Sequence, residues 1–285
     1  MASPSPFSGK VHPISAAGFG PGKSELYDKV RPGYAPQVLS HIRKAVSKKE
    51  GLKIVEIGCG SGIFTRALLA HPEWSTSVAE LKCIDPNEGM RAVFASTVKD
   101  SRVSLSEGTF DETDVPDGWA DLIVSASAFH WCSELEGAIN EFSRILKSDG
   151  TICFLWNSQD KKNTAWIRQI HELCDPHQKV AASGKDTFNN WRRIFDLPQY
   201  KANFSEPEET IVPSTETRTV ESLTLHVFTR SGVAILPDEE KEKVREGIKV
   251  IVQRGDELVW VNKKEGILEV PFATPIVVIQ RQALQ

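Results

Sequence analysis

The sequence predicts an α/β protein with a doubly wound, mainly parallel sheet. Short β-branched segments alternate with amphipathic helical segments from residue 52 onward, and this alternation is typical of βαβ units. Three of the strand segments, 52–57, 121–124 and 151–156, are almost continuously apolar, as strands covered by helices on both faces are. Because βαβ crossovers are right-handed, these units wind into one twisted sheet with helices on both sides.

The segment before the first strand predicts a lead-in followed by two helices. Residues 1 to about 23 are rich in Ser, Pro and Gly and predict irregular structure. Apolar residues then recur at helical spacing from Ser24 to Lys49, and Pro32-Gly33 divides them into two helices. We expect residues 1–49 to supply this lead-in and a pair of lid helices.

Residues 50–158 form the predicted core. Turn signals close the first two of its strands, namely the glycines after Ile57 and the Asp85-Pro86 pair. The core strands are expected at 52–57, 78–84, 103–105, 121–125 and 151–156. The core helices are expected at 64–70, 88–98 and 135–146.

The pattern weakens after Trp156, where helical segments predominate. Helical spacing recurs at 166–174, 190–195, 220–228 and 238–253. Two further strand-like segments, 204–212 and 275–280, raise the number of predicted strands to seven. We therefore expect residues 159–285 to supply cap helices and the C-terminal strands that complete the sheet.

Composition and charge narrow the possible functions. Lys and Arg total 34 and Asp and Glu total 38, so the net charge is −4, which argues against binding to a nucleic-acid backbone. No apolar run approaches the roughly 18 to 20 residues that span a bilayer, and residues 1–10 lack the apolar region of a secretory signal. We expect a cytoplasmic protein with no membrane partner, and a monomer or homodimer.

The cysteines predict neither a metal site nor a disulfide framework. Their number is odd, no pair has the CxxC spacing, and each lies in or beside an apolar segment. Reduced thiols that pack as small hydrophobic side chains fit this pattern. The histidines also show no ligand spacing, so no metal is expected. The five residues are Cys59, Cys83, Cys132, Cys153 and Cys174.

A glycine-rich turn and a later carboxylate predict a ligand that contains ribose. The turn Gly58-Cys-Gly-Ser-Gly62 follows the first strand, at the sheet edge where ligands of open α/β folds bind. Asp85 ends the second strand, 23 residues after Gly62, where a carboxylate can accept both ribose hydroxyls. An alternative is a plain turn with Asp85 capping the next helix.

The glycine spacing resembles one class of ribose-binding protein. The third glycine comes one residue earlier than in the dinucleotide fingerprint, and Glu56 stands two residues before Gly58. Both features resemble the class I S-adenosylmethionine-dependent methyltransferases, over about residues 50 to 156. The resemblance implies a Rossmann-like methyltransferase fold, and it makes a nicotinamide dehydrogenase the less favoured interpretation.

The resemblance also implies cofactor-binding residues. Met90 would pack near the adenine, the segment after the third strand would frame it, and the end of the fourth strand would lie beside the methionine part. The predicted lid could add Tyr27 and Arg31. Arg31 could bind a carboxylate of the cofactor or of the substrate. The predicted cofactor residues are Tyr27, Arg31, Glu56, Gly58, Gly60, Asp85, Pro86, Met90, Thr109, Phe110, Ser125 and Ala126.

A narrower resemblance concerns the acceptor. The segments Tyr27 to Tyr34, Ala128 to Trp131 and Thr229 to Pro237 are similar to the small-molecule branch that includes the trans-aconitate methyltransferases. Aromatic walls with one amide are typical of a small-ligand pocket. The predicted pocket residues are Tyr34, Phe129, Trp131, Trp156 and Asn157, although core packing would explain the tryptophans equally well.

The predicted reaction is methyl transfer from S-adenosylmethionine to a small molecule, with S-adenosylhomocysteine as product. We expect methylation at oxygen, either a carboxylate or a hydroxyl. His130, after the fourth strand, is the predicted catalytic residue, as a base or as a hydrogen-bond donor to the substrate; a purely structural role is the alternative. An N-methyltransferase of the same fold and a non-catalytic cofactor-binding interaction protein are the rival functions.

Overall fold

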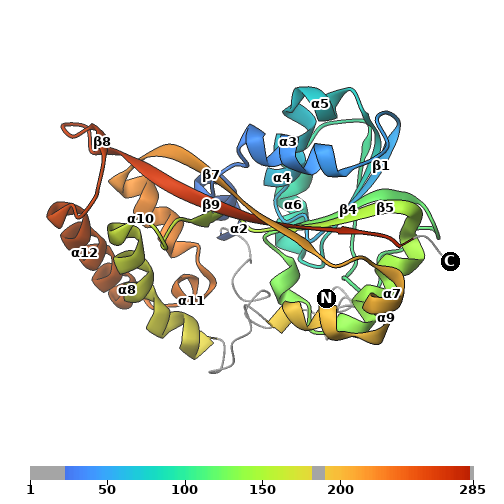
Figure 1. Ribbon diagram of the computed structural model, residues 1–285. Coiled ribbons are helices and arrows are strands. Elements are labelled where there is room, and N and C mark those ends of the chain that lie inside the picture. The colour runs from blue at the N-terminus through green and yellow to red at the C-terminus, as the bar shows by residue number, and fades with distance from the viewer. Residues whose placement is uncertain (1–22, 182–189, 283–285) are drawn as a thin grey trace, which may run out of the picture.

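The computed structural model describes residues 23–181 and 190–282, and Figure 1 shows their arrangement. The predicted lead-in lies outside the described residues, apart from its last residue. The chain forms a central sheet with helices on both faces, and a group of cap helices at one end. The predicted α/β class, mainly parallel sheet and helical cap are therefore confirmed.

Five parallel strands make the core of the sheet, in the order β3-β2-β1-β4-β5. Their carboxyl ends meet at one edge, so the turns that follow β1, β2 and β4 lie close together. The sequence placed β1 and β2 at the bounds that the structure gives them. The core strands are β1 (Leu52–Ile57), β2 (Val78–Ile84), β3 (Val103–Ser106), β4 (Ala120–Ala126) and β5 (Leu146–Leu155).

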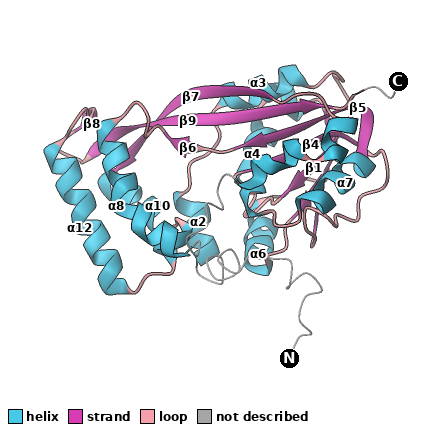
Figure 2. Cartoon of the chain, turned by 60° about the horizontal axis from the view of Figure 1, so that its bottom comes forward, coloured by secondary structure: helices cyan, strands magenta, loops and turns pink. Residues whose placement is uncertain are grey.

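Two long antiparallel strands extend the sheet from the core into the cap. The second half of β9 (Ile267–Gln280) pairs with β5, and β7 (Glu208–Thr219) pairs with β9 along its whole length. Figure 2 shows this two-stranded ribbon running from the core to the cap helices. The expected strands at 204–212 and 275–280 exist, but they begin at residues 208 and 267.

Within the described residues the sheet has nine strands, so the predicted number of seven was too low. The two additional strands, β6 (Ser158–Gln159) and β8 (Trp260–Asn262), are short and pair only at the edge of β9. Strands of two or three residues carry no alternation that a sequence pattern could reveal.

Helices cover both faces of the core sheet, as a doubly wound fold requires. On one face lie α3 to α6, and on the other lie η1, α7, η2 and α9. The first group comprises α3 (Pro36–Ala45), α4 (Ile63–Ala70), α5 (Pro72–Ser75) and α6 (Glu88–Thr97). The second comprises η1 (Phe129–Trp131), α7 (Leu135–Ile145), η2 (Asn190–Asp196) and α9 (Pro198–Asn203).

The cap has a hydrophobic core of its own. Four helices pack there on the first half of β9, through Trp166, Leu223 and Ile248 among others. The helix α2 (Lys23–Val30) lies between the cap and the core and packs against α10. The cap helices are α8 (Ala165–Ala181), α10 (Val220–Phe228), α11 (Ser231–Ala234) and α12 (Asp238–Arg254).

The five cysteines are all buried and unpaired within the described part of the chain. They pack in the apolar clusters, as the sequence predicted. Desolvation by burial raises the pKa of each thiol, for example that of Cys132 to about 12, so the neutral thiol is the form present near neutrality.

Candidate functional site

The glycine turn after β1 has a backbone that only glycine adopts readily. Gly58, Gly60 and Gly62 have φ angles of 76°, 56° and 87°, in the left-handed region. A Cβ on Gly58 would lie 2.4 Å from the Cβ of Ala128, whereas a Cβ on Gly60 would meet nothing within 4 Å. The turn is therefore packed behind Gly58 and open at Gly60, where a ligand can reach the backbone.

Asp85 stands beside this open position. One carboxylate oxygen, Oδ2, accepts a hydrogen bond of 2.8 Å from the backbone N–H of Gly60, and Oδ1 accepts one of 2.8 Å from that of Asn87. Burial raises the pKa of Asp85 to about 6. These two backbone hydrogen bonds fix the carboxylate at the carboxyl edge of the sheet, next to the Gly60 backbone.

Glu56, in β1, contacts the helix that follows the turn. Its Oε2 accepts a hydrogen bond of 2.6 Å from the hydroxyl of Thr65 in α4, and the side chain is only 1% exposed. Burial raises the pKa of Glu56 to about 8. The carboxyl group therefore holds α4 against the sheet, a supporting position behind the turn that the sequence did not foresee.

The loop after β3 lies against the same turn. The Thr109 hydroxyl donates a hydrogen bond of 2.6 Å to Asp111, and the Phe110 ring lies edge-on to Phe129 with 5.2 Å between the centroids. A Cβ on Gly58 would lie 3.7 Å from Phe110. Phe110 thus packs beneath the glycine turn. Asn87 caps the neighbouring helix α6, Pro86 lies just before this cap, and Met90 lies in the first turn of the helix.

The end of β4 carries a strained residue that joins three segments. Ser127 has a φ of 57°, a conformation that a non-glycine residue rarely adopts and that concentrates at functional sites. Its hydroxyl lies 3.1 Å from the hydroxyl of Tyr34 and accepts a hydrogen bond of 3.3 Å from the backbone N–H of Asn157. Just before it, Ala126 is partly buried, and Ser125 is fully buried with an unpartnered hydroxyl.

The segment after α2 is anchored over these strand ends. The side-chain amide of Asn157 donates to the carbonyl of Gly33, while Tyr34 packs edge-on against Phe64. Arg31 lies over the ring of Tyr27 and donates two hydrogen bonds of 2.9 Å to Thr229 in the cap. The predicted lid residues are therefore brought together, and Arg31 fastens this segment to the cap.

His130 follows β4 and is held by one tryptophan. The indole N–H of Trp156 donates a hydrogen bond of 3.1 Å to Nδ1 of His130. Since an indole nitrogen can only donate, Nδ1 is an acceptor here and a neutral His130 carries its proton on Nε2. The ring of Trp131 lies beside the imidazole, with 4.8 Å between the centroids.

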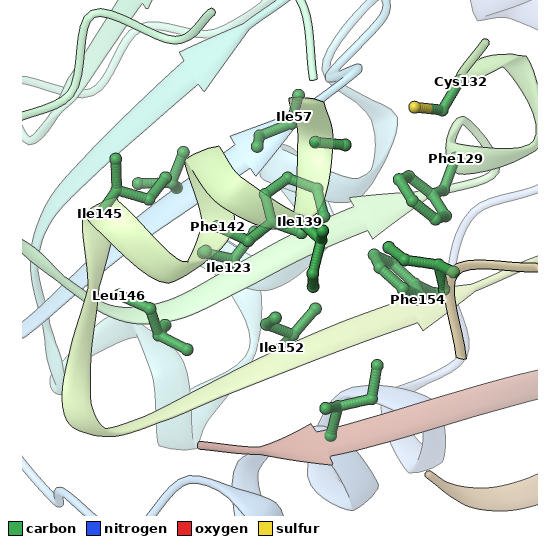
Figure 3. Close-up of a cluster of buried hydrophobic side chains, with 14 of the residues drawn as sticks. Ile57, Ile123, Phe129, Cys132, Ile139, Phe142, Ile145, Leu146, Ile152 and Phe154 are labelled. Carbon is green, nitrogen blue, oxygen red and sulfur yellow. The ribbon is translucent and has the colours of Figure 1, made fainter. Parts of the chain in front are cut away.

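Phe129 is a core residue, and its prediction as a pocket wall was wrong. Its side chain is 0% exposed and stacks on Phe154, with 4.1 Å between the ring centroids. Phe110, Phe142 and Trp191 surround the pair, and Figure 3 shows Phe129 and Phe154 at one end of the buried cluster. A strand end can point inward as well as outward, and the sequence does not distinguish the two.

The comparisons with known proteins agree with this geometry. Residues 55–154 match the methyltransferase domain family, and this range covers the glycine turn, Asp85 and the ends of β4 and β5. The matched part of the chain is therefore similar to a methyltransferase domain. An uncharacterised methyltransferase of Schizosaccharomyces pombe is 26% identical over 227 residues, which cover 80% of this chain and 84% of that protein.

Solved structures share the fold of the methyltransferase domain. A candidate type II methyltransferase from Anaeromyxobacter dehalogenans superposes with a TM-score of 0.59 and 14% identity, over 87% of this chain and 97% of that one. A phosphoethanolamine N-methyltransferase from Haemonchus contortus, solved with S-adenosylhomocysteine and phosphomonomethylethanolamine, gives a TM-score of 0.55 and 14% identity, over 92% of this chain and 57% of that one.

Several residues near this site were not predicted from the sequence. Asn87, Ser127 and Thr229 each hold a predicted site residue by a hydrogen bond. Asn87 gives the clearest signal, because an Asn before a helix is a common cap. Ser127 gave no signal, and Thr229 appeared only as the first residue of the similar segment Thr229 to Pro237, since the roles of both depend on contacts between segments that are far apart in sequence.

The described residues add two negative findings. Residues 23–181 and 190–282 hold no group of three or more His, Cys, Asp or Glu side chains placed to bind a metal ion. In the same part of the chain, no helix has the length and apolar character needed to cross a membrane.

The buried Glu56 predicts a pH dependence of stability. The pKa of Glu56 rises from 4.5 to about 8 in the folded state, so the folded protein holds this proton more tightly than the unfolded chain does. The resulting stabilisation is fully present below pH 4.5 and is lost as the pH rises through 8. Between pH 6.5 and 8.5 the free energy of unfolding should fall by about 2 kcal/mol from this group alone. Urea unfolding of the wild type and of Glu56→Gln checks this, because the amide cannot ionise.

Above pH 6.5 the change in the free energy of unfolding reports on Glu56 and not on Asp85, because Asp85, with its pKa of about 6, is already mostly ionised there. A matched control is Glu73→Gln, which changes an exposed carboxyl group in α5. The control should keep the wild-type slope. If Glu56→Gln also keeps it, Glu56 is ionised in the folded protein at pH 6.5 and the assignment fails.

Proposed function

We propose that the protein transfers a methyl group from S-adenosylmethionine to an oxygen of a small molecule, and that this oxygen belongs to a carboxylate. The observation that carries the proposal is the pairing of Asp85 with the open backbone of Gly60. A carboxylate fixed beside a bare turn can accept hydrogen bonds from a ribose while the backbone contacts the rest of the cofactor.

The residues present fit S-adenosylmethionine. Asp85 would accept the ribose hydroxyls, and Gly58 and Gly60 would lie along the methionine part. The other predicted cofactor residues would follow the resemblance, with Glu56 acting from behind the turn. When bound, the cofactor supplies an electrophilic methyl group on a sulfonium. The complex of the Haemonchus enzyme with S-adenosylhomocysteine supports this choice on a shared fold.

The acceptor would bind at the carboxyl ends of β4 and β5. Tyr34, Trp131 and Asn157 line the approach, while the segment after α2 covers it through its contacts with Asn157 and Thr229. A covered site excludes water. It also holds the acceptor oxygen in line with the methyl group. Removal of this cover would therefore slow the reaction.

The state of His130 favours a carboxylate acceptor. The indole of Trp156 donates to Nδ1, so a neutral His130 carries its proton on Nε2 and is not set to remove a proton from the acceptor. A carboxylate is already ionised at neutral pH and needs no base, whereas an alcohol or a protonated amine must lose a proton. We infer that His130 orients one oxygen of the acceptor while the other meets the methyl group.

His130→Ala should therefore raise KM more than it lowers kcat. Loss of one hydrogen bond to a charged group costs about 1.5 to 3 kcal/mol, which corresponds to about a 10- to 100-fold rise in KM. Steady-state kinetics from pH 6 to 8 should give a flat kcat, because no base titrates in the reaction.

Trp156→Phe is the informative second variant, because it frees Nδ1 and keeps an aromatic ring against Trp191. A kcat that rises through a pKa near 6 to 7 in the wild type, together with a large loss of kcat in His130→Ala, would establish His130 as a base. An alcohol acceptor would then replace the carboxylate in the proposal.

The direct test is a metabolite screen with S-adenosylmethionine labelled in its methyl group. We expect one or a few small carboxylic acids to gain the label as methyl esters, which mild alkali would hydrolyse. Label that resists alkali would indicate N-methylation or an ether. A protein that binds S-adenosylhomocysteine by calorimetry but labels nothing would fit the non-catalytic alternative.

The remaining expectations concern setting and assembly. The acidic net charge of −4 supports a small-molecule acceptor and no nucleic-acid partner. We propose a cytoplasmic enzyme that acts as a monomer or homodimer and requires no metal.

A further inference from the structure

A cluster of basic side chains lies between the cap and the strand ends. Arg230, which follows α10, donates a hydrogen bond of 2.6 Å to Oε1 of Gln159 in β6. The same guanidinium nitrogen lies 3.1 Å from Nε2 of His171 in α8. His226 in α10 is within the electrostatic reach of both Arg230 and Arg31. Elements of the cap, the core edge and the α2 segment thus meet here; Figure 2 shows α2 beside α10.

Among the described residues, the charge of the cluster is only partly compensated. Asp175 on α8 offsets Arg230 in part, and Glu216 is paired with Arg218 at 2.8 Å. Arg31 donates from Nε and Nη2 to Thr229, which is neutral, and Lys161 adds its charge to the field at His171. The region therefore contains two carboxylates, Asp175 and Glu216, and four cationic side chains. The cations are Arg31, Lys161, Arg218 and Arg230.

The two histidines do not add to the charge. Burial, together with the charge of Arg230, lowers the pKa of His171 to about 3. Burial and the neighbouring arginines hold the pKa of His226 well below its usual range. Both imidazoles are neutral near pH 7, so the field comes from the arginines and Lys161. Burial also lowers the pKa of Arg230, which means that its charge is poorly solvated.

Two buried polar atoms at the cluster have no partner. The amide nitrogen of Gln159 and Nδ1 of His226 make no hydrogen bond, and the two residues are 6% and 4% exposed. Arg230 fixes the orientation of the Gln159 amide, because it occupies Oε1 and leaves the Nε2–H donors for another group. A buried donor without an acceptor is costly and needs an explanation, and an oxyanion would satisfy it.

We propose that Arg230 and Gln159, with His226 and His171 beside them, form a site for an oxyanion group of the methyl acceptor, either a carboxylate or a phosphate. Arg230 would bind this group as a charged donor and Gln159 would give a second hydrogen bond. The site rests on the proposed function, and it adds that the acceptor carries a second anionic group besides the oxygen that is methylated. Gln159 lies two residues after Asn157, so one small molecule can reach both places.

The test is calorimetric titration of the protein with malonate, inorganic phosphate and malonamide, in the presence of saturating S-adenosylhomocysteine. Malonate or phosphate should bind, and malonamide, which has the shape but not the charge, should not. The tighter of the two anions identifies the group that the acceptor carries. Equal binding of malonamide and malonate, or no binding of either anion, would overturn the proposal.

Substitutions locate the binding. Arg230→Gln should weaken the preferred anion at least tenfold, and Gln159→Leu several-fold. The control Arg254→Gln removes an exposed arginine of the cap helix α12 and should leave the affinity within twofold. Should Arg230→Gln not fold, Arg230→Lys and Gln159→Leu carry the test. If both the Arg230 variant and Gln159→Leu bind the anion with wild-type affinity, the proposed site is refuted.

The cofactor titration separates this proposal from the proposed function. S-adenosylhomocysteine should bind Arg230→Gln and the wild type equally well. If the wild type does not bind S-adenosylhomocysteine, the proposed function fails, while anion binding without the cofactor still tests the site. If Arg230→Gln loses the cofactor and the anion together, the cluster belongs to the cofactor site and the acceptor assignment is wrong.

Discussion

Asp85→Ala should weaken the binding of S-adenosylhomocysteine by about two orders of magnitude. The variant loses the charged acceptor of both ribose hydroxyls, and hydrogen bonds to charged groups contribute about 1.5 to 3 kcal/mol each. It also releases the backbone N–H of Gly60, which Asp85 now orients at 2.8 Å. Isothermal titration calorimetry measures the change directly.

The fold should tolerate this substitution. Because burial raises the pKa of Asp85, the ionised carboxylate is disfavoured in the folded state, and its removal should cost little stability. Asp85→Asn keeps one acceptor oxygen and should fall between the wild type and the alanine variant. Asp149→Ala, an exposed carboxylate at the opposite edge of the sheet, serves as the control. An unchanged affinity in Asp85→Ala would remove the ribose assignment.

Phe129→Ala should lower the free energy of unfolding by about 3 to 5 kcal/mol, the range for removal of a buried aromatic side chain. Phe129 is fully buried and stacked on Phe154, and it holds the start of the loop that carries His130. Urea unfolding followed by tryptophan fluorescence gives the value.

Phe129→Leu provides the comparison, because it keeps an apolar side chain in the same space and should cost clearly less. Phe129→Ala and Phe129→Leu together distinguish a pocket wall from a core residue. A pocket wall would leave the free energy of unfolding nearly unchanged in Phe129→Ala and raise KM. A core residue gives a large loss of stability in Phe129→Ala and a smaller one in Phe129→Leu.

The sequence predicted the core strands well because local physics determines them. Strands 52–57 and 78–84 are bounded by glycines, by an Asp-Pro pair and by changes of hydrophobic period, and these signals act over a few residues. The last strand was placed too late because Pro271 and Pro275 suggest breaks. In the structure both prolines lie within β9 and use their carbonyl groups, which accept from Asp160 and Trp156.

Only those parts of the site whose residues lie close together in the sequence could be predicted. The glycine turn and Asp85 belong to one βαβ unit, so their juxtaposition could be inferred. The contact of Arg31 with Thr229 spans 198 residues, and the hydrogen bond from Trp156 to His130 crosses between two strand ends. Such pairs depend on how elements pack, and no local pattern records them. For the same reason, the cluster around Arg230 could not be foreseen.

The continuous ribbon of β7 and β9 limits how this protein can be re-engineered. Residues 276–280 of β9 pair with β5 of the core, while residues 267–272 carry the apolar side chains on which the cap helices pack. A chimaera that exchanged the cap with that of a relative would have to cut both strands of this ribbon. These two junctions would fall inside paired strands, so the exchanged segment would have to preserve both the register of β7 on β9 and the alternation of its faces. Changes of acceptor specificity should therefore be sought by substitution within the cap.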